Sequence, residues 1–147
     1  EALYQILDFI QNFADRFHHT REATYLFPAL GRNGFQKEGG ALRFLTEEHE
    51  IERLLMAELE QAIGDYSHGD SAAIDRFVET ANLYRDHLVG HMQEEDTILF
   101  RLAEEVLDEA VKASLIQSFA QEEAQDCDGM IARYERLAQE LEKNWAV

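Results

Sequence analysis

A short pattern that occurs twice constrains this chain more than any other feature of its sequence. The pattern His-x3-Glu-x3-Leu-Phe begins at His18 and again at His91, with its carboxylates at Glu22 and Glu95. The offset is constant, because 91 − 18 and 95 − 22 both equal 73. Residues four apart lie one turn apart on the same face of an α-helix. The repeat therefore predicts two helices, each presenting a histidine and a carboxylate together.

The apolar residues recur at helical spacing in four long segments, which predict the fold. A glycine-rich loop at 31–40 and a turn at 64–70 separate the first three segments, and Pro28 is expected to kink or end the first. Connections this short favour antiparallel neighbours. We therefore expect an all-α, up-down helical bundle of four long antiparallel helices in a single domain, 1–147. The expected helices span 2–29, 41–63, 72–104 and, from an N-cap at Asp108, 108–143.

The composition indicates an acidic helical protein. Of its 147 residues 46% are hydrophobic and one is proline, while Asp plus Glu number 30 against 13 Lys plus Arg, a formal net charge of −17. An acidic surface is repelled by nucleic acid and by anionic membranes, so neither is an expected partner. No apolar run approaches the ~20 residues that span a bilayer. No signal peptide is visible and Cys127, the one cysteine, has no partner for an internal disulfide, so we expect a cytoplasmic protein in which Cys127 serves packing.

Several polar residues stand where the apolar repeat calls for Leu or Val. They are His91 and Glu95 in the third segment and His49 in the second. The predicted buried face of the third segment also contains Ile74, Val78 and Ile98. A buried carboxylate without a partner is costly, so it is normally paired, protonated or bound to a metal. A single histidine in such a stripe is more often a hydrogen-bonded core residue, and His18 with Glu22 alone would fit a surface pair. Together, however, the five residues predict a buried metal site.

Two further residues are candidate ligands. His87 precedes His91 by four residues, so it shares a helix face and can supply another nitrogen. Glu123 is the polar residue in the stripe of the last segment. Three interpretations of Glu123 stay open: a metal ligand, a hydrogen-bond partner of a ligating histidine, or a solvated surface group. His19 points about 100° away from its neighbour His18, which favours His18 as the ligand.

The residue types indicate which metals such a site would hold. Imidazole suits iron, copper and zinc, and carboxylates can bridge two ions. Bundle-core sites built from these ligands commonly hold two iron or manganese ions. The chain has no Cys-x2-Cys pair, so a structural zinc site or an iron–sulfur cluster is not expected. We expect iron, with manganese or zinc as alternatives.

These motifs resemble the hemerythrin-like, or HHE cation-binding, family over about residues 2–140. The likeness rests on residues 13–22, 26–30, 38–40, 48–50 and 91–95. The resemblance implies a histidine, a His-x3-Glu pair, a second histidine and a second pair, contributed by four helices. It places the second histidine at His49 and the pairs at His18/Glu22 and His91/Glu95. It further implies two non-haem irons with an oxo or hydroxo bridge, spanned by the two glutamates.

The sequence departs from the family pattern in three places. Ala23 stands where relatives often carry a second acidic residue. Arg101 stands where relatives often have a proline directly after the second Leu-Phe. The family's first histidine is absent, and the repeat would put it upstream of residue 1, since 49 − 73 = −24. We therefore expect an upstream first helix that this chain lacks, a substitute in Glu123, or a helix from a partner chain. A bundle face left open in this way would favour a homo-oligomer.

Three hypotheses for function follow. The first is a non-haem diiron protein that binds dioxygen or a related small ligand, in oxygen or nitric oxide binding or sensing or in iron or peroxide handling. The second is a metal-free or zinc-loaded helical interaction module. The third is an iron sensor whose fold the metal stabilises. We favour the first, as a metal- and oxygen-binding protein rather than a dedicated enzyme; whether it has an enzymatic activity stays open.

Overall fold

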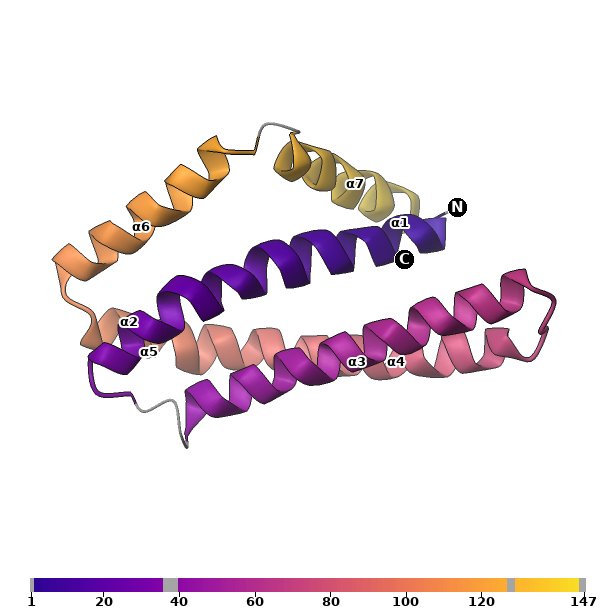
Figure 1. Cartoon of the computed structure of the whole chain (residues 1–147), viewed down its shortest axis with the longest axis horizontal. Coiled ribbons are helices and arrows are strands. Elements are labelled where there is room, and N and C mark those ends of the chain that lie inside the picture. The colour runs from indigo at the N-terminus through magenta and orange to yellow at the C-terminus, as the bar shows by residue number, and fades with distance from the viewer. Residues whose placement is uncertain (1, 36–39, 127–128, 146–147) are drawn as a thin grey trace. The chain divides into compact units, whose positions relative to one another are not determined.

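The computed structural model describes residues 2–35, 40–126 and 129–145, and these residues form helices and no strand (Figure 1). The predicted all-α class is thereby confirmed. Cys127 lies outside the described residues. The chain divides into two compact units, which we call the terminal unit (Glu1–Tyr25 with Asp108–Val147) and the central unit (Leu26–Leu107). Within the described ranges, no helix has both the length and the apolar character needed to cross a membrane.

The first helical run is longer than predicted and contains π-helical turns. In such turns the backbone hydrogen bonds join residues five apart, instead of four apart as in an α-helix. Pro28 does not end this run, because it stands in the first turn of α2, where a missing N–H costs least. The run continues to Arg32. Its parts are α1 (Ala2–Phe9), η1 (Ile10–His19), η2 (Glu22–Leu26) and α2 (Phe27–Arg32).

The central unit is built on a helical hairpin. Figure 1 shows α3 and α4 side by side and antiparallel, as the short turn between them predicts. Their facing sides supply buried apolar residues such as Leu45, Met56 and Tyr84. The hairpin consists of α3 (Ala41–Ser67) and α4 (Ala73–Glu94), and the chain continues from α4 into η3 (Glu95–Leu99) and α5 (Phe100–Val106).

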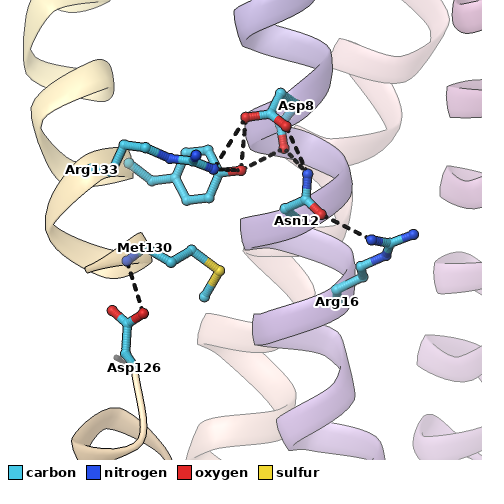
Figure 2. Close-up of polar contacts among 7 residues, drawn as sticks. Asp8, Asn12, Arg16, Asp126, Met130 and Arg133 are labelled. Atoms are coloured by element: carbon cyan, nitrogen blue, oxygen red, sulfur yellow. Dashed lines mark hydrogen bonds and ion pairs between the residues drawn. The ribbon is translucent and has the colours of Figure 1, made fainter. Parts of the chain in front are cut away.

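In the terminal unit, the predicted continuous helix over 108–143 is wrong, because two helices replace it: α6 (Glu109–Ala124) and α7 (Met130–Trp145). Gly129 has a φ of 62°, a left-handed conformation that interrupts a helix. The Asp126 carboxylate then accepts the N–H of Met130 at 2.8 Å (Figure 2) and the N–H of Ile131 at 2.9 Å, which starts α7. The predicted N-cap at Asp108 is confirmed by its 2.9 Å bond from the Val111 N–H.

Helix α7 packs against the first helical run inside the terminal unit. Tyr134 is fully buried, and its hydroxyl donates to Asp8 Oδ2 at 2.8 Å. Its ring meets those of Phe9 and Phe13 at centroid distances of 5.7 and 5.9 Å. Figure 2 shows Arg133 reaching the same Asp8 carboxylate, at 3.4 Å. Helix α7 is thus joined to α1 and η1 by polar contacts at Asp8 and by ring contacts at Phe9 and Phe13.

Candidate metal centre

The central unit brings three of the predicted ligands together in its interior. His49 comes from α3, His91 from the last turn of α4, and Glu95 is the first residue of η3. Nε2 of His91 lies 3.0 Å from Oε1 of Glu95. The rings of His49 and His91 meet edge to face at 4.9 Å, with a nitrogen of one within 4.8 Å of a nitrogen of the other. All three residues are at most 5% exposed.

A π-helical turn begins at the carboxylate of each repeat. The turn η2 starts at Glu22 and ends at Leu26, and η3 starts at Glu95 and ends at Leu99. The sequence repeat is thus also a repeat of backbone structure. Single π-turns in long helices occur frequently at functional sites. The periodicity of apolar residues did not predict them.

The turn η3 changes which residues face the interior. The sequence predicted Ile98 in the buried stripe, but its exposed fraction is 47%, whereas the next residue, Leu99, is fully buried. The prediction was wrong because a π-turn takes one more residue than an α-turn and shifts the register by one. Ile74 and Val78, also predicted in this stripe, are exposed at 39% and 52%.

Glu48 is part of the cluster, although sequence reasoning did not select it. Its Oε2 accepts a hydrogen bond from Nδ1 of His91 at 2.9 Å, and the residue is 7% exposed. A carboxylate on one ring nitrogen fixes the orientation of a histidine and leaves the other nitrogen for a ligand. Here that other nitrogen is Nε2, the one that faces Glu95. The available signal was the position of Glu48, three residues after the buried Leu45 on α3.

His87, a further candidate ligand, lies at the side of the same cluster. Its Nε2 is 3.8 Å from Oε1 of Glu52 and 3.3 Å from the carbonyl oxygen of Glu48. Its ring is parallel to that of His91, with centroids 6.5 Å apart. Glu52 is 3% exposed and is a second carboxylate that was not selected as a ligand, although helical spacing puts it on the same face as His49.

The electrostatics of the cluster favour a cation. Burial lowers the pKa of His91, but its hydrogen bonds to Glu95 and Glu48 outweigh that effect and raise the pKa to about 9. Burial raises the pKa of the Glu52 carboxyl, and the nearby histidines act against this rise. The buried carboxylates are therefore compensated by positive charge at His91. A metal cation can supply that charge instead of a proton, and imidazole nitrogen with carboxylate oxygen is a donor set that suits iron or zinc.

The terminal unit carries the other predicted pair. Nε2 of His18 lies 3.9 Å from Oε1 of Glu22, where the side chains are 45% and 5% exposed. His19, the neighbour that the sequence analysis did not favour, is the more buried histidine at 4%, and its Nδ1 is 3.6 Å from Asp15. The His-x3-Glu spacing thus places its two side chains on one face, as predicted.

Glu123 belongs to an ion-pair network of the terminal unit. Its Oε1 accepts from Arg21 Nη1 at 3.1 Å, and its side chain is 54% exposed. Arg21 also pairs with Glu122 at 3.0 Å and covers the ring of Phe17 at 3.7 Å. Tyr25 donates to the same Glu122 at 2.8 Å. Of the interpretations left open for Glu123, the one these contacts favour is a partially solvated partner of Arg21.

The comparison with protein families decides the class of the chain. A family model described as the hemerythrin HHE cation binding domain matches residues 1–103. The chain belongs to the hemerythrin HHE family. Both His-x3-Glu pairs and His49 fall in the matched part, and the fold class is the all-α bundle of the hemerythrin type. Membership indicates a metal-binding domain, which the buried His–Glu cluster of the central unit fits. No curated protein and no solved structure matches the chain.

Proposed function

We propose that this hemerythrin-type domain is a non-haem diiron protein that binds dioxygen or a related small ligand. The observation that carries the proposal is the pair of donor atoms, Nε2 of His91 and Oε1 of Glu95, 3.0 Å apart beside the ring of His49 in a buried cluster. Family membership supports a cation site, and the donor set supports iron. The single cysteine of the sequence supports a reducing compartment such as the cytoplasm.

The proposed ligands come from both repeats. His49, His91 and Glu95 belong to the central unit, and His18 with Glu22 is the equivalent pair 73 residues earlier, since 91 − 18 = 73. The equivalence is supported by the π-turns that start at the two glutamates. In this proposal Glu22 and Glu95 would supply carboxylate ligands for two irons. His87 stays a further proposed ligand.

The residues around the proposed centre have separate parts in this proposal. When bound, two irons supply two electrons for reversible binding of dioxygen. Glu48 holds His91 by Nδ1, so that Nε2 stays turned toward Glu95. Buried apolar side chains, among them Leu45 and Leu99, keep bulk water from the cluster. Exclusion of water protects a reduced centre from side reactions.

The experiment that tests the ligand assignment replaces the two glutamates. We predict that Glu95→Gln and Glu22→Gln each lose bound iron, because an amide of the same shape is neutral and is a poor bridging ligand. The matched control is Glu60→Gln, an exposed position on α3. Iron per folded chain, measured by elemental analysis, should fall from roughly two to below one in both ligand variants and stay unchanged in the control. Full iron content in Glu95→Gln would contradict the assignment.

A further inference from the structure

An apolar pocket opens in the central unit where the start of α3 meets η3. Its volume is about 280 Å³. Leu45 forms its inner wall and is 2% exposed, whereas Phe44 and Ile98 form its outer walls and are each 47% exposed. The complete lining is Gly40, Ala41, Phe44, Leu45, Glu94 and Ile98.

The pocket shares its walls with the elements that carry the candidate ligands. Leu45 precedes His49 by one α-helical turn, a rise of about 6 Å along the same face of α3. Ile98 lies in the π-turn that begins at Glu95. Leu45 therefore lies in the buried interior together with the His–Glu cluster, while Phe44 and Ile98 are partly exposed to solvent. A molecule inside the pocket is about one helical turn from the ligands.

The π-turn itself produces the outer wall. In a regular α-helix Ile98 would stand within about 20° of His91 and face the interior. The register shift of η3 instead turns Ile98 outward and puts Leu99 into the core, fully buried. The backbone feature that starts at a proposed ligand thus also opens the pocket beside it.

The lining indicates the class of molecule that fits. Apart from Glu94, every lining side chain is apolar or absent, so the pocket favours a neutral apolar guest. The carboxylate of Glu94 and the formal net charge of −17 disfavour anions. An apolar cavity of about 150 Å³ already binds benzene or xenon. The volume here exceeds that size.

We propose that this pocket binds small neutral apolar molecules of the dioxygen class and is their route to the His–Glu cluster. The binding claim stands on the pocket alone, and the route rests on the proposed function. The lining accounts for selectivity, because dioxygen and nitric oxide are neutral and apolar, whereas anionic ligands are repelled at Glu94. A small neutral molecule such as dioxygen therefore fits this lining better than an anionic ligand does.

Xenon tests the binding claim without any iron. The full chain, labelled at Leu and Ile methyl groups, is titrated with xenon in the presence of zinc(II), which leaves the sample diamagnetic whether or not it binds. We expect saturable shifts of the Leu45 and Ile98 methyl resonances. Ala41→Phe fills the pocket and should abolish these shifts, and Ala57→Phe, at an exposed position of the same helix, should keep them. Absence of saturable shifts, or equal shifts in Ala41→Phe, would overturn the proposal.

The route is tested by ligand association rates. After laser photolysis of nitric oxide from the iron-loaded protein, the bimolecular rate should fall several-fold in Ala41→Phe and not in Ala57→Phe. An unchanged rate in Ala41→Phe would overturn the route. An iron-loaded wild type that binds neither nitric oxide nor dioxygen would refute the proposed function, and the xenon shifts would still decide whether the pocket binds apolar molecules.

Discussion

At the scale of single residues, Glu48 and His91 form the contact on which the candidate site depends most. The 2.9 Å bond from Nδ1 of His91 to Glu48 fixes the ring, and the 3.0 Å approach of Nε2 to Glu95 defines where a cation would sit. A histidine held in this way keeps its ligand nitrogen aimed at one point. The orientation of His91 is thus set before any metal binds.

We predict that Glu48→Ala weakens metal binding by roughly 10- to 100-fold, because His91 loses the group that orients it. Glu48→Gln should lose less, since its amide oxygen still accepts from Nδ1. Competition with a chromophoric chelator measures both affinities. Glu60→Ala, an exposed change on the same helix, is the control and should bind as wild type does. Equal affinities in Glu48→Ala and wild type would show that Glu48 has no orienting role.

The sequence could predict the ligand candidates but not their surroundings. His91 and Glu95 were recognisable because a polar pair at helical spacing interrupted an apolar stripe and because the pair was repeated. Glu48 was missed, since a carboxylate next to a histidine in an acidic segment looks like part of a solvated face. Its burial depends on how α3 and α4 pack, which a single helix pattern does not contain. Glu52 shares a helix face with His49 but was not selected as a ligand.

At the scale of elements, the apolar periodicity placed the helices well and their interruptions poorly. The hairpin of α3 and α4 begins where the pattern predicted. The π-turns η2 and η3 were not predictable, because a one-residue register shift leaves only a small trace in the spacing of apolar residues. That shift is why Leu99 and not Ile98 is buried. The break between α6 and α7 was missed because apolar spacing continued through it.

The caps of the last two helices give a prediction at this scale. Asp126 accepts two N–H groups at the start of α7, and Asp108 accepts one at the start of α6. We predict that Asp126→Ala and Asp108→Ala each lower the free energy of unfolding by about 1 kcal/mol. Hydrogen exchange should accelerate at the Met130 amide in the first variant and at the Val111 amide in the second. Each variant serves as the other's control, and exchange that changes equally at both amides would contradict this cap assignment.

At the scale of the whole molecule, the central and terminal units each contribute proposed ligands. Anything that binds the folded state and not the unfolded state stabilises the fold by mass action. With His18 and Glu22 among the proposed ligands, a bound metal is expected to stabilise the terminal unit as well as the central unit. The family match, over residues 1–103, includes proposed ligands of both.

We predict that iron(II) raises the melting temperature and slows hydrogen exchange in both units, and that a chelator reverses the effect. Mass spectrometry of exchanged peptides separates the two, with peptides from α3 reporting the central unit and peptides from η1 the terminal unit. In Glu95→Gln the metal-dependent protection should be lost in both. Protection confined to the central unit would mean that His18 and Glu22 are not ligands.

The measurement that tests the central claim most directly is elemental analysis of the purified full chain, combined with its ultraviolet–visible spectrum before reduction, after reduction and after return to air. The account predicts roughly two irons per chain and a charge-transfer band that bleaches on reduction and returns with dioxygen. One metal ion or fewer per chain, or zinc without a visible band, would contradict a diiron site that binds dioxygen.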